Sequence, residues 1–229
     1  MITGIIGAMN VETDALKALI KDPEKETVSG VEFVHGTIHG KKVVVAQCGI
    51  GKVFAALCAQ TMILRYGVKR IINTGVAGGL SDHLHLLDIA ISTAVVQHDM
   101  DTSPLGDPVG LISGINQVEL PASLPLAKQI AEIASSMGKH YEFGVIASGD
   151  QFIAAPDKKE WLIRTFGPIA CEMEGAAIGH TCYVNGVDFV IIRSISDHAS
   201  EDAGTMEYPE LCRHAAAQSQ RLIEAFFAV

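Results

Sequence analysis

Cys171-Glu-Met-Glu-Gly-Ala-Ala-Ile-Gly179 and Phe189-Val-Ile-Ile-Arg-Ser-Ile-Ser-Asp197 form the stretch that decides the expected fold. Residues 167–171 and 187–195 are short apolar runs, which are typical of buried strands. The segment between them has the length of a helix and ends at Asn185-Gly186, where glycine accepts the left-handed conformation of a helix C-cap. A strand, a crossover helix and a second strand predict a βαβ unit, whose two strands run parallel and end at one edge of a sheet.

Carboxylates stand at both strand ends of this unit. Glu172 and Glu174 follow the first strand, and Asp197 ends the second. Ligands of open α/β sheets bind in the crevice outside the carboxyl ends of the strands. The stretch therefore predicts a crevice that receives carboxylates from both strand ends, and it does not distinguish Glu172 from Glu174.

The rest of the chain continues this alternation of short strands and helices. We expect strands at 2–8, 69–73, 86–97 and 143–147, a hairpin over 30–49, and helices at 12–20, 53–66, 124–137, from 156 onward and at 207–227. This order predicts a three-layer α/β fold, in which helices flank a central mixed, mostly parallel sheet. No repeat or linker divides the chain, so residues 1–229 are expected to form a single domain.

Composition limits the classes of partner. The chain is 48% hydrophobic and 19% charged, with a formal net charge of −9. The acidic balance argues against nucleic acid and anionic membranes, and no apolar run is long enough to span a bilayer. The five cysteines include no Cys-x-x-Cys pair and the N-terminus has no signal-peptide pattern, so we expect reduced thiols in a cytoplasmic protein.

Helix 53–66 is apolar nearly all round. A helix without a polar face must be covered on both sides, so this helix is predicted to form a homodimer interface. Residues 102–121 are rich in proline and glycine and predict a long loop, a kind of segment that is usually functional or mobile.

Two segments could bind a phosphate or a metal ion, and neither carries a motif for it. Residues 74–80 are expected to form a glycine-rich loop, but the loop lacks the Gly-Lys-Ser/Thr of a P-loop and opens no Gly-x-Gly-x-x-Gly helix. His98, Asp99 and Asp101 follow a strand with a spacing that matches no metal motif. The sequence therefore predicts neither a metal nor a cofactor.

The residues at the expected strand ends indicate the chemistry. Carboxylates and apolar side chains predominate there: Glu12, Glu174 and Asp197 with Met9, Ile50, Phe152, Ile153 and Met173. Such a site suits a neutral, partly apolar ligand with hydroxyl groups. Carboxylates without a nucleophile motif predict acid/base hydrolysis, in which one carboxyl protonates the leaving group and another activates water.

Six motifs in the same order resemble the family of 5′-methylthioadenosine/S-adenosylhomocysteine nucleosidases, within the purine nucleoside phosphorylase/hydrolase superfamily. They are Gly4-Ile-Ile-Gly-Ala-Met9 with Glu12, Gly49-Ile-Gly-Lys-Val53, Asn73-Thr-Gly-Val-Ala-Gly-Gly79, Ser148-Gly-Asp-Gln-Phe-Ile153, Glu172-Met-Glu174 and Arg193-Ser-Ile-Ser-Asp197. The resemblance implies a nucleoside phosphorylase-like fold, a homodimer, and cofactor-free hydrolysis that releases adenine and a 5′-thioribose product, as in nucleoside catabolism and methionine salvage.

The resemblance also implies roles for individual residues. Asp197 would give a proton to N7 of adenine, Glu12 would activate the water that attacks C1′, and Glu174 would hold the ribose hydroxyls. Glu172 has no part in this assignment and is therefore expected to be a structural residue. The remaining expected substrate contacts are Met9, Ile50, Gly78, Phe152 stacking on the base, the backbone of Ile153 reading its edge, Met173 on the sugar, Arg193 orienting the acids, Ser196 positioning Asp197, and Tyr208 as a lid.

Several alternatives stay open at this point. A phosphorylase of the same superfamily would need arginines for phosphate, and Glu12 would repel that anion. A 6-amino-6-deoxyfutalosine hydrolase or a 5′-deoxyadenosine nucleosidase would share the adenine and ribose contacts, and a non-catalytic nucleoside-binding protein would tolerate loss of the acids. Loop 102–113 is expected to join the dimer interface. Because Leu105 and Asp107 replace aromatic residues of the family there, the preference among 5′-substituents and the pathway remain unassigned.

Overall fold

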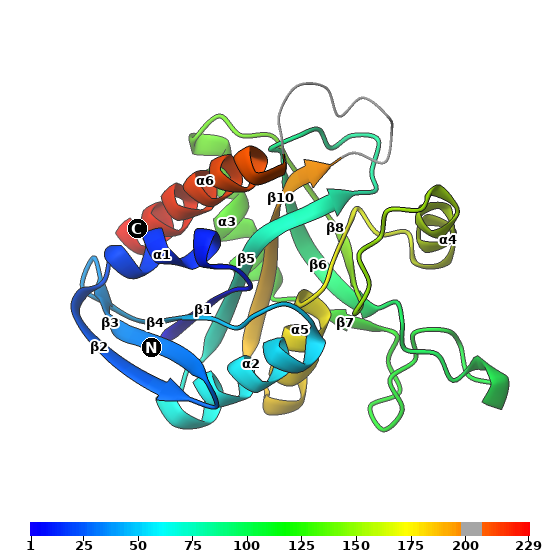
Figure 1. Cartoon of the computed structure of the whole chain (residues 1–229), viewed down its shortest axis with the longest axis horizontal. Coiled ribbons are helices and arrows are strands. Elements are labelled where there is room, and N and C mark those ends of the chain that lie inside the picture. Colours follow the sequence, from blue (N-terminus) through cyan, green and yellow to red (C-terminus); the bar gives the residue numbers. More distant parts are fainter. Residues whose placement is uncertain (198–207) are drawn as a thin grey trace.

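The computed structural model of the chain describes residues 1–197 and 208–229, and of Tyr208 only the backbone (Figure 1). The strands are β1 (Thr3–Gly7), β2 (Lys21–Val28), β3 (Val31–Ile38), β4 (Lys41–Gln47), β5 (Arg70–Gly79), β6 (Ile89–Gln97), β7 (Glu119–Pro121), β8 (Tyr141–Ser148), β9 (Ala170–Glu172) and β10 (Asp188–Asp197). The helices are α1 (Asn10–Ala18), α2 (Lys52–Tyr66), α3 (Leu124–Ser136), α4 (Pro156–Phe166), α5 (Gly175–Asn185) and α6 (Tyr208–Ala228), with a 3₁₀ turn at Ser103–Leu105.

One continuous sheet contains these strands in the order β10-β6-β8-β9-β5-β1-β4-β3-β2, with β7 beside β6. Strand β5 also pairs with β10, which closes β10, β6, β8, β9 and β5 into a ring. Among the described residues, five pairings are parallel and five are antiparallel. The predicted mixed sheet is thus confirmed, with parallel and antiparallel pairing in equal measure.

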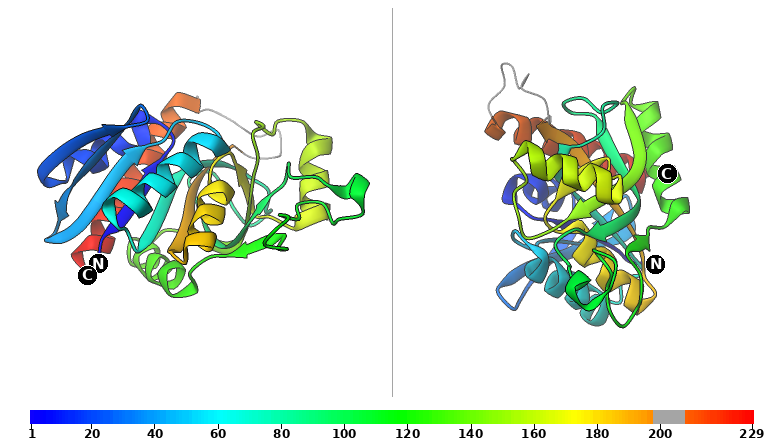
Figure 2. Two further views of the ribbon diagram at one scale, coloured as in Figure 1. Left: turned by 90° about the horizontal axis from the view of Figure 1, so that it is seen from below. Right: turned by 90° about the vertical axis from the view of Figure 1, so that its right-hand side faces the viewer.

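Helices cover both faces of the sheet because its strands alternate apolar side chains between two cores. Ile5 of β1 packs in one core with residues of α1, α3 and α6, such as Leu16. Its neighbour Ile6 packs in the other core with residues of α2 and α5, such as Ala55 and Ala176. Figure 2 shows these helices on opposite sides of the strands. The predicted three-layer arrangement is confirmed.

The predicted parallel βαβ unit at residues 167–197 is wrong. Strand β9 pairs antiparallel with β5, whereas β10 pairs parallel with β5, so β9 and β10 run in opposite directions. The two acidic ends still meet, because β9 is short and lies against the last residues of β5. Gly78 pairs with Cys171 on one side and with Asp197 on the other.

Two further expectations need correction. The glycine-rich segment 74–80 was expected as a loop, but β5 continues through Gly79, because its backbone is paired on both sides by β9 and β10. Strand β2 was not predicted; its side chains are mostly exposed and charged, as at a sheet edge. The hairpin, the helix that ends before Gly67 and the helix that begins at Pro156 are confirmed.

Helix α2 has two apolar faces of different character. Ala55, Cys58, Ala59 and Met62 are buried against the sheet and α5. On the other face the exposed apolar side chains are Val53, Phe54, Leu57 and Leu64, which are 51–74% exposed. Among the described residues, no helix is both long and apolar enough to cross a membrane.

Candidate active site

One pocket gathers chain segments that lie at or directly after the ends of β1, β4, β5, β8, β9 and β10. Its lining consists of Ala8, Met9, Glu12, Ile50, Val76, Ala77, Gly78, Gln151, Phe152, Ile153, Cys171, Glu172, Met173, Glu174, Ser196 and Asp197. All predicted site residues are present except Arg193, which lies behind the pocket, and Tyr208, whose side chain falls outside the described residues. The structure therefore brings segments from the whole length of the chain to one place.

Glu12 is held by backbone N–H groups at the start of α1. Its Oε2 accepts hydrogen bonds from the N–H groups of Ala8 (2.7 Å) and Met9 (2.9 Å), and its Oε1 accepts one from Val76 (3.3 Å). The side chain is only 4% exposed. Burial raises the pKa of Glu12, although Arg193 and these N–H groups oppose the rise. A buried carboxylate with a raised pKa is suited to accept a proton from water.

Gly75 in β5 makes room for this carboxylate. A Cβ atom at Gly75 would lie 2.6 Å from Oε1 of Glu12 and closer still to Nη1 of Arg193. Only a residue without a side chain therefore lets the carboxylate and the guanidinium approach the β5 backbone together. Gly75 was expected to lie in a loop, and it lies within strand β5 instead.

Glu174 lies between α2 and α5 at the far side of the pocket floor. Its Oε1 accepts a hydrogen bond from the N–H of Gly51 (2.9 Å), and its Oε2 lies 3.6 Å from Nη2 of Arg193. Burial and the neighbouring Glu172 raise the pKa of Glu174 to about 7, against the attraction of Arg193. This carboxylate is therefore poised to change its charge near neutral pH.

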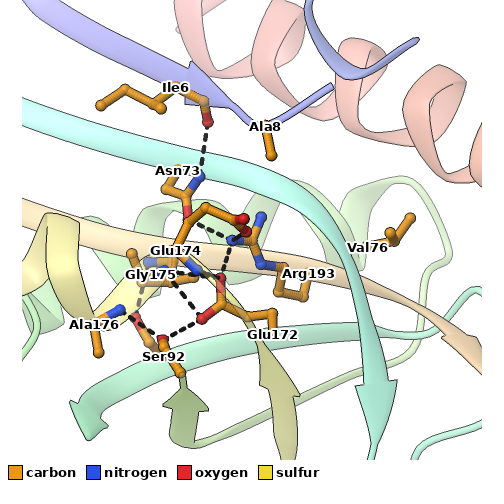
Figure 3. Close-up of polar contacts among 12 residues, drawn as sticks. Ile6, Ala8, Asn73, Val76, Ser92, Glu172, Glu174, Gly175, Ala176 and Arg193 are labelled. Atoms are coloured by element: carbon orange, nitrogen blue, oxygen red, sulfur yellow. Dashed lines mark hydrogen bonds and ion pairs between the residues drawn. The ribbon is translucent and has the colours of Figure 1, made fainter. Parts of the chain in front are cut away.

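Arg193 and Glu172 form a buried ion pair next to Glu174 (Figure 3). Arg193 is 1% exposed, and its Nη2 also donates to Oδ1 of Asn73 at 2.6 Å. Glu172 accepts the N–H groups of Glu174 (3.1 Å) and Gly175 (2.8 Å) and the hydroxyl of Ser148. Because all these donors converge on Glu172, its carboxylate fixes the start of α5, as expected for a structural residue.

Asp197 ends β10 and lies over the backbone of β5. Both of its carboxylate oxygens would be 3.4 Å from a Cβ atom at Gly78. The hydroxyl of Ser196 lies 3.2 Å from Oδ1 of Asp197, within reach for donation, and 3.4 Å from the carbonyl oxygen of Ala77. Asp197 is half-buried and lines the pocket.

The pocket mouth is apolar. Phe152 is 71% exposed and Ile50 is 57% exposed, whereas Ile153 behind them is buried. Exposed apolar side chains at the rim leave two flat surfaces that a base or an alkyl group could cover. This exposure at a pocket rim is typical of a binding site and not of a packed core.

Six lining residues were not predicted as site residues: Ala8, Val76, Ala77, Gln151, Cys171 and Glu172, the last of which was expected to be structural. Ala8 and Val76 contribute backbone N–H groups, which no side-chain pattern reveals. Gln151 directly precedes the predicted Phe152, and Cys171 lies two residues before the predicted Met173, so proximity in the sequence was the available signal.

The pocket offers no cation for a phosphate among the described residues. Its charged lining side chains are all acidic, namely Glu12, Glu172, Glu174 and Asp197. The guanidinium of Arg193 is buried and committed to Asn73 and Glu172. An anionic co-substrate would therefore meet repulsion, whereas water and a neutral ligand would not.

We expect Glu174→Gln to raise the melting temperature at pH 8 by roughly 2–4 °C, the shift produced by about 1 kcal/mol in a chain of this size. The folded pKa of Glu174 lies above its ordinary value, so the stability gained from protonation is complete below about pH 4.5 and is lost as pH rises through about 7. Glutamine imitates the protonated form at every pH. Thermal unfolding should show a gain at pH 8 that vanishes near pH 5, and an equal shift at both values would contradict this explanation.

The comparisons with known proteins agree on one family. Residues 2–228 match the family model described as the phosphorylase superfamily. The chain is 42% identical over 202 residues to the 5′-methylthioadenosine/S-adenosylhomocysteine nucleosidase of Shewanella halifaxensis. The matched region covers 87% of this chain and 87% of that protein.

Two solved structures from Helicobacter pylori are also similar. One is the same type of nucleosidase, an aspartate-to-asparagine mutant with 5′-methylthioadenosine in its active site; it is 36% identical, has a TM-score of 0.91, and the match covers 98% of this chain and 96% of that one. The other is a futalosine hydrolase with 35% identity and a TM-score of 0.91, matched over 99% of this chain and 97% of that one.

Proposed function

The chain belongs to the 5′-methylthioadenosine/S-adenosylhomocysteine nucleosidases of the phosphorylase superfamily, and from this membership we propose the function and the role of each residue. The enzyme hydrolyses the N-glycosidic bond of 5′-methylthioadenosine and S-adenosylhomocysteine. The products are adenine and the corresponding 5′-thioribose, so the reaction belongs to nucleoside catabolism and fits methionine salvage.

Two carboxyl groups divide the proton transfers. Asp197 gives its proton to N7 of adenine while the bond between C1′ and N9 breaks, so the base leaves as a neutral purine. Glu12 takes a proton from the water whose oxygen forms the new bond to C1′. Both partners lie in one pocket, Glu12 over Gly75 and Asp197 over Gly78 of the same strand. The cationic character that the ribose gains in the transition state is stabilised by the acidic lining.

The other site residues bind the nucleoside. Glu174 accepts hydrogen bonds from the ribose hydroxyls, and Met173 packs against the sugar. Phe152 stacks on adenine and the backbone of Ile153 reads its edge. Met9, Ile50 and Gly78 complete the walls, Ser196 orients Asp197, and Arg193 fixes the acids from below.

The observation that carries hydrolysis over phosphorolysis is that every charged side chain lining the described pocket is acidic. A phosphorylase has to bind phosphate, which arginine recognises through paired hydrogen bonds. Here the only nearby guanidinium, among the described residues, is buried beneath Glu172 and Glu174. Residues 198–207 contain neither lysine nor arginine.

Incubation with 5′-methylthioadenosine, with and without inorganic phosphate, tests this function. We expect adenine and free 5-methylthioribose at equal rates in both conditions. Adenine release that requires phosphate, together with a ribose 1-phosphate product, would show a phosphorylase instead. No adenine release in either condition would remove the enzymatic function.

A second candidate substrate is 6-amino-6-deoxyfutalosine, which the similarity to a futalosine hydrolase favours. This nucleoside offers the same adenine and ribose groups and differs in its 5′-substituent, as does 5′-deoxyadenosine. Competition between it and 5′-methylthioadenosine, measured as the ratio of kcat/KM, separates the two substrates. A ratio above 1 for 6-amino-6-deoxyfutalosine would make it the better substrate.

We propose a homodimer formed through α2 and loop 102–113. The exposed apolar face of α2 and the 84% exposed Leu105 support it, because exposed apolar patches mark interaction sites. Light scattering at micromolar concentration should give twice the mass of one chain, and a monomer would contradict the proposal. Loop residues Leu105 and Asp107 would then influence the preference for the 5′-substituent.

The remaining proposals concern organisation and location. Residues 1–229 form a single nucleoside hydrolase domain, supported by the continuous sheet and by the family match over residues 2–228. Neither a metal nor a cofactor is proposed for the reaction. A cytoplasmic location is supported by five buried cysteines, none of which forms a disulfide bond; cell fractionation that finds the protein outside the cytoplasm would refute it.

A further inference from the structure

A closed circuit of hydrogen bonds joins three segments beside the pocket. Asp99 follows β6, and its side chain is 16% exposed. Its Oδ1 accepts a hydrogen bond from Nζ of Lys52 at 2.6 Å, and its Oδ2 accepts one from the N–H of Asp150 at 2.8 Å. Both carboxylate oxygens are therefore engaged, one by a side chain and one by a backbone.

Asp150 closes the circuit. Its Oδ1 accepts a hydrogen bond at 2.7 Å from the N–H of Lys52, the first residue of α2. A carboxylate at this position satisfies a free N–H of the first helical turn and matches the positive end of the helix dipole. Lys52 also donates to Oε1 of Gln97 at 3.1 Å, which ties its side chain to the end of β6 a second time.

The circuit connects two neighbouring loops that both line the pocket. Residues 49–51 lead into Lys52, and within them Ile50 lines the pocket while Gly51 donates to Glu174. Residues 151–153 follow Asp150 and form the pocket wall at which adenine is proposed to bind. Gly51 has a φ of 100°, and a Cβ atom there would lie 3.0 Å from Oδ1 of Asp150, so the loops touch.

Neither proton-transferring residue takes part in these bonds. Glu12 is held by the backbone of residues 8, 9 and 76, and Asp197 contacts Ser196. A change in the circuit would move the walls around the base and sugar and leave the acid and the base in place.

We propose that Lys52, Asp99 and Asp150 are positioning residues that hold loop 49–51 and loop 149–153 at the spacing required by the base and ribose of the nucleoside. This inference rests on the proposed function. Walls that contact the ligand before and during the reaction bind the ground state and the transition state alike. Their displacement raises KM and leaves kcat nearly unchanged.

Asp150→Ala tests the proposal most directly, because Asp150 is exposed and its loss creates no cavity. With 5′-methylthioadenosine we expect KM to rise about tenfold, the effect of losing one hydrogen bond to a charged group, while kcat stays within about threefold. The inhibition constant of free adenine should rise as well. Asp99→Asn keeps one acceptor for the N–H of Asp150, so its effect should be smaller than that of Asp99→Ala.

Arg65→Met is the matched control. Arg65 lies in the last turn of the same helix, and its Nη2 forms an ion pair at 2.5 Å with Glu26, far along the chain from either loop. Loss of this pair should leave KM, kcat and adenine inhibition at their wild-type values. A change equal to that of Asp150→Ala would mean that any disturbance of α2 has the same effect, which overturns the proposal.

Two further results would also overturn it: an unchanged KM in Asp150→Ala, or a fall of kcat equal to the fall of kcat/KM. If the wild-type enzyme released no adenine, the proposed function would fail separately. Calorimetric binding of adenine to the wild-type and variant proteins would then decide the inference, since it requires weaker binding in Asp150→Ala whether or not turnover occurs.

Discussion

Asp197→Asn is expected to lower kcat for 5′-methylthioadenosine by about 10²–10⁴-fold, the usual contribution of a positioned general acid. Asparagine has the same shape, and its amide oxygen can accept the Ser196 hydroxyl as Oδ1 of Asp197 does at 3.2 Å. It can donate a hydrogen bond to N7 of adenine but cannot transfer a proton. KM should therefore change little, and steady-state kinetics with detection of adenine measures both constants.

A change of leaving group separates this role from a general loss of structure. A 5-methylthioribosyl substrate with 4-nitrophenolate as leaving group needs no proton to depart. Asp197→Asn should cleave it at nearly the wild-type rate, because Glu12 and its three N–H donors are untouched. Equal losses on both substrates would remove Asp197 from the role of acid.

Much of the fold could be predicted because its elements carry strong local signals. Helix α2 has a continuous apolar run and a glycine at its end, and Gly67 adopts the left-handed conformation that this signal requires. Strand β10 is a run of β-branched residues that is buried along nearly its whole length. Local sequence determines such elements, so their positions were confirmed.

Strand direction could not be predicted, because it depends on partners far away in the chain. Strand β9 has three residues, too few to show a pattern, and its direction is fixed by pairing with the end of β5 and with β8. An apolar strand, a helix and a second strand suggested parallel strands, yet the closed ring reverses β9. The acids meet because of the pairing at Gly78, and not because of the βαβ geometry.

In the site, the side chains could be predicted from the sequence, whereas the backbone contacts could not. The carboxylates of Glu12, Glu174 and Asp197 were visible as acids at strand ends, and one pocket contains them all. The N–H groups of Ala8 and Val76 that hold Glu12 were not visible, because any residue offers an N–H. The polar residues that follow β6 matched no motif and received no role from the sequence, whereas in the structure Asp99 is engaged by Lys52 and Asp150.

Glu12→Gln is expected to lower kcat by about 10²–10⁴-fold, because the amide cannot accept the proton of the attacking water. Misfolding would not explain this loss, since the amide oxygen can still accept the N–H groups of Ala8 and Met9. Burial raises the pKa of Glu12, so replacing this carboxyl by a neutral amide should stabilise the protein at pH 8. Kinetics and thermal unfolding of the same sample check both statements.

Glu12→Ala with added azide distinguishes a base from a residue that only binds substrate. Azide is a nucleophile that needs no deprotonation, and the shortened side chain leaves room for it over Gly75, where Oε1 of Glu12 approaches the strand within 2.6 Å of a would-be Cβ. We expect azide to restore adenine release in Glu12→Ala and to yield a ribosyl azide, but not to restore Asp197→Asn, whose missing proton azide cannot supply. A residue that deprotonates water becomes dispensable when the nucleophile carries no proton, and a residue that only binds substrate does not. Glu12 would therefore lose its assignment as the base if azide rescued neither variant, or if it rescued both equally.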